Sequence, residues 1–280
     1  MNIYEYTGLT FKDQTLWTEK LAVDGDRIYF FGFDNKDKTY RTKLRSVSYK
    51  DEKLSDLKVL DGRANWRYRL GVSNGTVYDW HKRRDYNSIK ANSPDYWHYY
   101  DGKAMVPTDL RGMTLVPIDQ GKDVVYTEGS DYWIGTLEKG KLTKGKKLLS
   151  GTEAKKDGLS LKGQWADKDG FYLMGYLKND KGGYYNVVRQ FSLKDGKLLQ
   201  TFEGPPTEES RGFAITEHRV VLGQKGGIYW IYSKKDGKLL RKAQTEPKLT
   251  MEILTPMKND SILIYRRINR SEAKLYRMDL

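Results

Sequence analysis

Short apolar runs alternate with turn residues along the whole chain. The runs are rich in β-branched and aromatic side chains, and Gly, Asp, Asn and Lys bound them on both sides. Runs of this kind, about four to eight residues long, are typical of β-strands joined by tight turns. The pattern therefore predicts an all-β protein.

The strands recur in one order: an acidic or amide residue, an apolar strand, a loop, a strand that opens with Tyr, a Gly-Lys turn and a basic strand. A four-stranded propeller blade takes roughly 40 to 50 residues. The pattern predicts a six-bladed β-propeller of four-stranded antiparallel blades, forming a single domain over residues 1–280. Six units begin, at spacings of 50, 49, 46, 48 and 42 residues, at Asp24, Asn74, Asp123, Asp169, Glu217 and Asn259. The predicted blades cover residues 15–61, 62–108, 109–150, 158–204, 210–246 and 250–280.

The last unit reaches only its third strand before the sequence ends at Leu280. The segment 2–7, NIYEYT, precedes the first unit and has no other place in the repeat. An open ring would leave exposed sheet edges. We therefore expect residues 2–7 to form the outermost strand of the sixth blade and to join the two ends of the chain.

A tyrosine opens the third strand of every unit. An aromatic sugar-binding box and packing between blades are both open interpretations, but recurrence in all copies favours packing. The six residues are Tyr40, Tyr96, Tyr132, Tyr185, Tyr229 and Tyr276.

The chain has 50 Lys and Arg residues against 37 Asp and Glu residues, a net charge of +13. Such a surface favours anionic partners. The loop from His81 to Asp95 is the longest expected hairpin loop, and it gathers His81, Arg83 and Arg84. These side chains are candidates for holding an anion. The alternative is a solvated basic loop.

Four further cations are expected at the heads of innermost strands. Alignment of the units places Arg67, Lys162 and Arg211 there, and Arg111 joins them if the third unit has a four-residue insertion. Innermost strands line the central channel of a propeller, so these cations would hold a carboxylate, phosphate or sulfate at its mouth. The ring is incomplete in the first and sixth units, and scattered surface charge is the alternative.

No motif indicates catalysis, a metal or a cofactor. The chain has no cysteine, and it lacks the GxSxG, HExxH, phosphate-loop and calcium-loop patterns. Its three histidines fall in different predicted elements, although His81 and His98 share a blade and could approach one another together with Asp79 or Asp85. Structural or exposed histidine is the favoured interpretation, with a metal or acid–base pair as the alternative.

The Tyr-Trp pairs and the two KDGKLL segments, 194–199 and 235–240, resemble bacterial six-bladed propellers of the TolB-like and quinoprotein-like kinds. Many of those proteins are exported or lipid-anchored. The resemblance implies a binding or scaffolding protein outside the cytoplasm, at the cell surface or in the periplasm. It also implies a lipoprotein anchor or signal segment absent from this sequence. A cytoplasmic protein is the alternative.

We therefore expect a non-enzymatic propeller that presents a basic loop face to an anionic glycan, a lipid headgroup or an acidic protein. The alternative is a polysaccharide lyase or hydrolase that acts on acidic glycans at the channel mouth. Nucleic acid is not the expected partner, because the basic residues are spread through all units and no recognised motif accompanies them. No apolar stretch approaches the roughly 18 residues of a membrane span.

Overall fold

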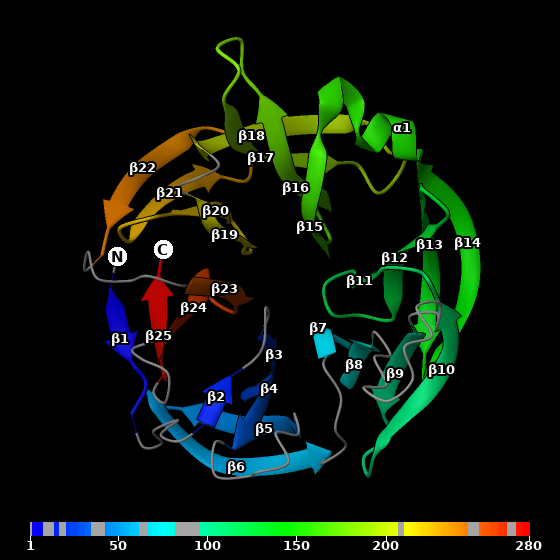
Figure 1. The fold of residues 1–280 in the computed structure, drawn as a ribbon, viewed down its shortest axis with the longest axis vertical. Helices are drawn as coiled ribbons and strands as arrows, with labels where there is room; N and C mark the ends of the chain where they lie inside the picture. The colour runs from blue at the N-terminus through cyan, green and yellow to red at the C-terminus, as the bar shows by residue number, and fades with distance from the viewer. Residues whose placement is uncertain are drawn as a thin grey trace.

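Six antiparallel sheets stand around a central axis in the computed structural model (Figure 1). The structure describes residues 2–7, 14–16, 21–34, 43–61, 67–81, 96–206, 210–245, 252–267 and 273–280. The innermost strands of neighbouring sheets contact each other, as β3 (Ala22–Asp24) does with β7 (Arg67–Ser73). The fold is therefore the predicted six-bladed β-propeller of four-stranded blades.

The strands of the blades follow one another along the chain from the centre outward. In the first blade, β2 and β3 both pair with β4 and share the innermost position. In the second blade, the outermost strand, β10, ends at Arg111 and so extends past the predicted blade boundary at residue 108. The first three blades contain β2 (Gln14–Leu16), β3, β4 (Arg27–Asp34), β5 (Lys43–Lys50) and β6 (Lys53–Asp61); β7, β8 (Thr76–His81), β9 (Tyr96–Tyr100) and β10 (Met105–Arg111); and β11 (Leu115–Pro117), β12 (Asp123–Glu128), β13 (Asp131–Glu138) and β14 (Lys141–Leu149).

The remaining blades repeat this order. A four-residue helix, α1 (Gly151–Ala154), and a 3-10 turn, η1 (Lys156–Gly158), connect the third blade to the fourth. The last three blades contain β15 (Ser160–Asp167), β16 (Gly170–Lys178), β17 (Tyr184–Phe191) and β18 (Leu198–Pro206); β19 (Ser210–Ile215), β20 (Arg219–Gln224), β21 (Ile228–Ser233) and β22 (Leu239–Gln244); and β23 (Glu252–Met257), β24 (Ser261–Arg267), β25 (Ala273–Asp279) and β1 (Ile3–Glu5).

The N-terminal strand closes the ring, as predicted. β1 lies antiparallel to β25, with Glu5 opposite Tyr276. Past β1, the Thr7 N–H donates to the Glu52 carbonyl at 2.9 Å, and the Leu54 N–H donates to the Thr7 carbonyl at 2.6 Å. Residues 2–7 therefore bond the sixth blade on one side and the first blade on the other.

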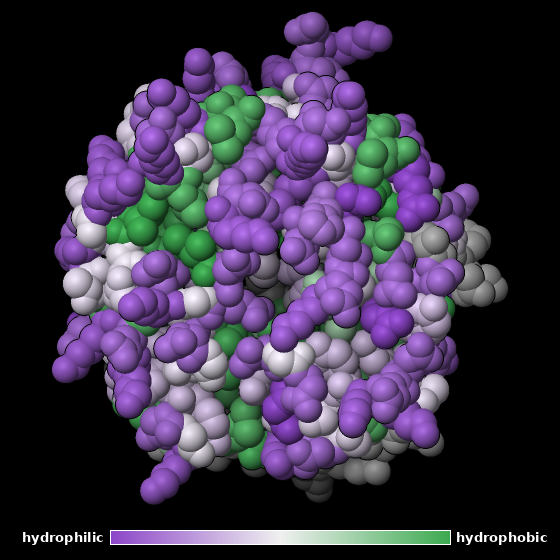
Figure 2. Space-filling view, turned by 180° about the vertical axis from the view of Figure 1, so that it is seen from behind, coloured by the Kyte–Doolittle hydropathy of each residue, from purple (hydrophilic) through white to green (hydrophobic). Residues whose placement is uncertain are grey.

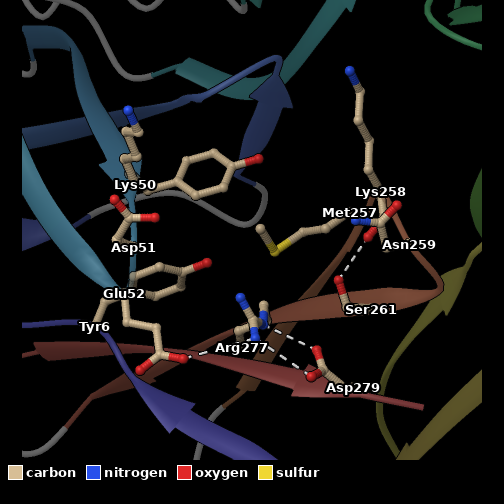
Figure 3. Close-up of a pocket in the computed structure, with 11 residues that line it drawn as sticks. Tyr6, Lys50, Asp51, Glu52, Met257, Lys258, Asn259, Ser261, Arg277 and Asp279 are labelled. Atoms are coloured by element: carbon tan, nitrogen blue, oxygen red, sulfur yellow. Dashed lines mark hydrogen bonds and ion pairs between the residues drawn. The ribbon is translucent and has the colours of Figure 1, made fainter.

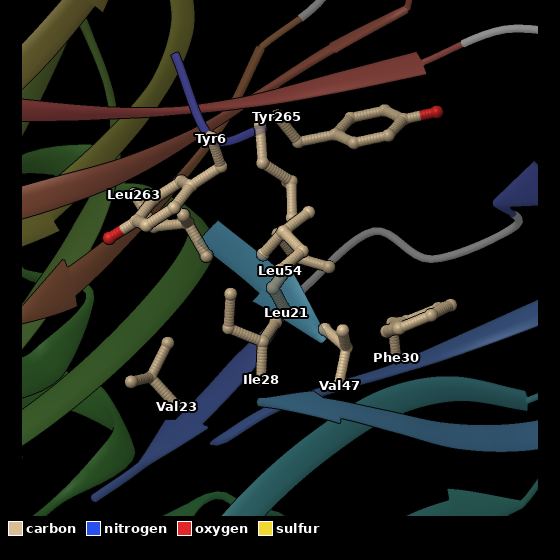
Figure 4. Packing of buried hydrophobic residues seen from close by; sticks show 10 residues of the cluster. Tyr6, Leu21, Val23, Ile28, Phe30, Val47, Leu54, Leu263 and Tyr265 are labelled. Atoms are coloured by element: carbon tan, nitrogen blue, oxygen red, sulfur yellow. The ribbon is translucent and has the colours of Figure 1, made fainter. Parts of the chain in front are cut away.

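A buried apolar cluster backs this closure (Figure 4). Tyr6 packs with Leu21 and Leu54 of the first blade and with Leu263 of the sixth. Each of these side chains is nearly inaccessible to water. Burial of apolar surface thus adds to the main-chain hydrogen bonds that join the chain ends.

The recurring tyrosines pack between blades where their side chains are described. Tyr132 of the third blade contacts Phe171 of the fourth, with ring centroids 5.1 Å apart. Tyr229 of the fifth blade packs with Ile262 of the sixth. These contacts support the packing interpretation for Tyr132 and Tyr229, whereas the side chains of Tyr40 and Tyr96 lie outside the described part of the chain.

The surface of the face opposite that of Figure 1 is mainly hydrophilic, with separate hydrophobic patches among the polar side chains (Figure 2). Within the described ranges, no helix has the length and apolar character that a membrane span needs.

The closing segment predicts a pH effect. Burial and the neighbouring Tyr49 raise the pKa of Tyr6 to about 12, although Arg277 opposes the shift. An unfolded tyrosine ionises near pH 10, so the stability that Tyr6 contributes is complete below about pH 10 and falls as the pH rises toward 12. Between about pH 9 and pH 11, Tyr6→Phe should lose about 1 kcal/mol less stability than the wild type.

Urea unfolding at the two pH values measures this difference. Tyr184→Phe, at an exposed tyrosine, is the control and should keep the wild-type pH dependence. Equal pH slopes for the wild type and Tyr6→Phe would show that Tyr6 is not buried by closure.

Candidate functional site

A cavity of about 490 Å³ lies on the axis of the ring. Residues from the innermost strands of all six blades line it, including Leu21, Leu70, Leu115, Phe213 and Leu254. The lining is apolar for the most part. The free edges of the six strands also face the axis, because an innermost strand has a neighbour on one side only. The cavity therefore combines an apolar wall with main-chain hydrogen-bonding groups.

Lys162 is the charged side chain among the described residues that line this cavity. It is the third residue of β15, near the end where the innermost strands begin, and it is exposed. Its Nζ lies 5.1 Å from the centroid of the Tyr176 ring on the next strand. A cation over an aromatic face is favourable and limits where the ammonium lies. Lys162 thus places a positive charge at this end of the cavity.

A turn of the third blade lies at the opposite end and contributes Gln120 to the lining. The Gln120 side chain donates to the Val23 carbonyl of the first blade at 2.6 Å, and the Asn74 N–H of the second blade donates to the Gln120 carbonyl at 2.6 Å. Asp119 and Gln120 both have positive φ, 52° and 57°, which is unfavourable for residues with a side chain. The two bonds to other blades hold this turn at the end of the cavity opposite Lys162.

The structure brings three of the four expected channel cations to one end of the ring. Arg67 is the first residue of β7 and Arg211 is the second residue of β19, both innermost strands. Their side chains lie outside the described part. Lys162 lines the cavity as expected.

Arg111 does not lie on an innermost strand, which corrects its expected position. It is the last residue of β10, the outermost strand of the second blade, and it pairs with Tyr96 after a register shift that begins at Pro107. The innermost strand of the third blade starts only at Leu115. Leu115 lies eight residues before the start of β12 at Asp123, so the expected four-residue insertion after Arg111 is absent and Leu115 takes the position that Arg111 was expected to hold.

The loop candidates are placed only in part. His81 ends β8 opposite Tyr96, with its side chain outside the described part of the chain, and Arg83 and Arg84 also lie outside it. β8 ends and β9 begins at the same end of the second blade as the start of β7. The predicted basic loop therefore connects strands at the end where Lys162 stands.

His98 has a structural partner. Its Nδ1 lies 3.1 Å from the Oδ1 of Asp79 on the adjacent strand, and both side chains are buried. This buried contact favours a structural histidine at position 98. Among the described residues, no three histidines or carboxylates are grouped as metal ligands.

A second pocket, of about 420 Å³, lies at the seam of the first and sixth blades (Figure 3). The Arg277 guanidinium is 2.9 Å from Asp279 and 3.8 Å from Glu52, and it lies over the Tyr4 ring at 4.5 Å. Two carboxylates already balance this cation, so we assign the pocket to closure of the ring. Sequence reasoning missed it because only closure brings these segments together.

A buried cation joins the fourth and fifth blades. The Lys234 Nζ is 2.9 Å from Asp167 and 2.7 Å from Asp169, and it donates to the Thr216 carbonyl at 3.0 Å. Burial disfavours the ammonium, but the two carboxylates outweigh burial and raise the pKa of Lys234. Burial also raises the pKa of Asp167 despite the lysine. The ammonium of Lys234 is thus paired with carboxylates inside the protein, and this ion pair stabilises the interface between the fourth and fifth blades.

Comparisons with known proteins show the class of the fold. No family model matches the chain, and no curated protein is similar to it in sequence. The WD40 β-propeller domain of Doa1 is similar over 99% of this chain and 97% of its own, with a TM-score of 0.53 and 10% identity. The CNH domain of AfRom2 is similar over 100% of this chain and 99% of its own, with a TM-score of 0.48 and 12% identity. The computationally designed Ika8 protein is similar over 94% of this chain and 71% of its own, with a TM-score of 0.44 and 13% identity.

The chain is thus a six-bladed β-propeller. At 10% identity the Doa1 domain shows the fold alone. The propeller fold is compatible with binding or scaffolding.

The blade interface at Lys234 supplies a test. Lys234→Ala should destabilise the protein by about 3–5 kcal/mol, because Asp167 is left buried without its partner. Lys235→Ala, at the exposed neighbour, should change stability by less than about 0.5 kcal/mol. Urea unfolding of both variants measures the difference.

Lys234→Ala combined with Asp167→Asn should recover part of the loss, since the buried charge is then removed. If Lys234→Ala and Lys235→Ala unfold at the same urea concentration, the buried ion pair does not hold the blades together.

Proposed function

We propose that the protein is a non-enzymatic binding or scaffolding propeller that holds an anionic group at the Lys162 end of its central cavity. The observation that carries the proposal is the position of Lys162. It is the charged side chain of the described cavity lining, and it stands near the end of the cavity where the innermost strands begin. An apolar wall beside it lowers the local dielectric and strengthens its attraction for an anion.

The charge of the chain supports this proposal. A net charge of +13 raises the local concentration of anionic partners around the whole molecule. The strands that begin with Arg67 and Arg211 start at the same end, as does the connection that contains Arg83 and Arg84. An acidic glycan, a lipid headgroup or an acidic protein side chain supplies the group that this end of the cavity attracts.

We place the protein outside the cytoplasm as part of the same proposal. This placement rests on the resemblance of its repeats to exported and lipid-anchored bacterial propellers. Fractionation of the source cells with an antibody against the propeller tests it: the periplasmic or surface fraction is expected, and a purely cytosolic signal would contradict it.

The binding proposal is tested with a defined polyanion. Polygalacturonate should bind the wild type in calorimetry and neutral dextran should not. Loss of one charge-assisted contact costs about 1.5 kcal/mol or more, so Lys162→Ala should bind polygalacturonate roughly tenfold more weakly. Lys141→Ala, at an exposed lysine on the outermost strand β14, is the matched control and should bind as the wild type does.

Three results would overturn the proposal. Equal weakening by Lys162→Ala and Lys141→Ala would point to scattered surface charge. Absence of any polyanion binding would remove the site. New unsaturated or reducing ends in the glycan would instead identify the lyase or hydrolase alternative.

A further inference from the structure

Four leucines are exposed at the beginning of two neighbouring outermost strands. Leu198 and Leu199 of β18 are 50% and 54% exposed, and Leu239 and Leu240 of β22 are 43% and 49% exposed. The other large apolar residues exposed in the described ranges stand singly on different strands, as Val59 does on β6. Paired exposed leucines in adjacent blades are therefore a distinct feature of this surface.

The turn before each outermost strand explains the exposure. In the first blade a two-residue turn leads from Lys50 to Lys53, and the following Leu54 is only 3% exposed beneath the N-terminal segment. In the fourth blade the turn is wider, because the Ser192 N–H donates to the Lys197 carbonyl at 2.9 Å across four residues. The fourth and fifth blades share this wider turn, and in both the two residues that follow its lysine are exposed leucines.

Both turns have the same fixed geometry. Gly196 and Gly237 adopt positive φ values of 70° and 71°, which glycine takes without strain. Asp195 accepts a hydrogen bond from the Lys197 N–H, and Asp236 accepts one from the Lys238 N–H. The sequence KDGKLL thus builds the same turn twice, with the same presentation of its two leucines.

The two turns are neighbours in space. The Gln200 side chain, one residue after Leu199, donates to the Lys234 carbonyl at the start of the fifth blade's turn, at 2.6 Å. A Cβ atom on Gly237 would lie 2.8 Å from Gln200. The turn that leads to Leu239 therefore rests against the strand that carries Leu199. We call the four leucines and the two turn lysines, Lys197 and Lys238, the leucine rim.

Positive charge surrounds these leucines. The side chains of Lys197 and Lys238 are each 79% exposed, and Lys194, Lys235, Arg241 and Lys242 are exposed beside them. Asp195 and Asp236 accept hydrogen bonds within their own turns and also lie 3.3 and 3.6 Å from the ammonium groups of Lys197 and Lys238. The excess positive charge therefore comes from the other four cations. Apolar side chains flanked by lysines are the combination that inserts into the headgroup region of a membrane and attracts its negative charge.

We propose that the leucine rim binds the surface of a membrane that contains anionic lipids. Neither of the two cavities described above is lined by a residue of this rim. Exposed leucines and exposed lysines on the perimeter fit a broad, fluid, negatively charged surface. This surface is separate from the central cavity, so the inference does not depend on the proposed function.

Co-sedimentation with vesicles tests this inference. The wild type should pellet with vesicles of phosphatidylcholine and phosphatidylglycerol at low salt, and should not pellet with phosphatidylcholine alone. Replacing all four leucines by serine should weaken binding by roughly tenfold or more, because the apolar anchor is lost. Lys197→Gln with Lys238→Gln should weaken it roughly fivefold for each lysine.

Matched controls separate the rim from general surface properties. Val59→Ser with Tyr184→Ser removes exposed apolar side chains elsewhere, and Lys141→Gln with Lys178→Gln removes two exposed charges elsewhere. Both controls should bind vesicles as the wild type does. Melting temperatures near that of the wild type would exclude loss of folding as the cause.

Two results would overturn the inference. One is vesicle binding that is absent from the wild type or equally weakened in rim and control variants. The other is sedimentation of the wild type as a dimer that the four serines convert to a monomer, without any vesicle binding. The leucines would then join two copies of the chain.

Discussion

Closure of the ring is the constraint on which the other features depend. The sixth blade obtains its outermost strand from residues 3–5, which pair with residues 271 to 275 positions later in the sequence. Thr7 then bonds the first blade through the main chain. Six innermost strands enclose one cavity only when the first and last blades are held together. The position of Lys162 at one end of this cavity therefore depends on the contacts that residues 2–7 make at the outer edge of the ring, between the sixth blade and the first.

No disulfide joins the blades, because the chain has no cysteine, so noncovalent contacts hold neighbouring blades against each other. Burial of large aromatic and aliphatic side chains between sheets supplies the general attraction, as with Tyr132 against Phe171. Polar contacts set the position of particular blades: Lys234 fixes the fifth blade to the fourth, and Gln120 links the third to the first. A turn with two strained residues is tolerated at Gln120 because its bonds reach two other blades.

The sequence predicts this fold well because each blade carries its own turn chemistry. In the fourth blade the third strand starts at Tyr184, one residue before the predicted Tyr185, and ends at Phe191, where the turn closed by Ser192 begins. The site is less predictable. Arg111 was misplaced because the assumed four-residue insertion is absent and the innermost strand of the third blade starts at Leu115. The seam around Arg277 forms only after distant segments meet. The exposed leucines after the two KDGKLL turns were not predicted either, because their exposure depends on the width of each turn.

Cross-linking of β1 to β25 tests closure most directly. Glu5 and Tyr276 face each other in the register, and the chain offers no other cysteine to compete. Glu5→Cys with Tyr276→Cys should form an intramolecular disulfide under mild oxidation and gain about 2–4 kcal/mol of stability that reductant removes. Glu5→Cys with Lys141→Cys, which pairs distant blades, should not cross-link. Failure of the first pair to cross-link in a folded protein would contradict closure by the N-terminal strand.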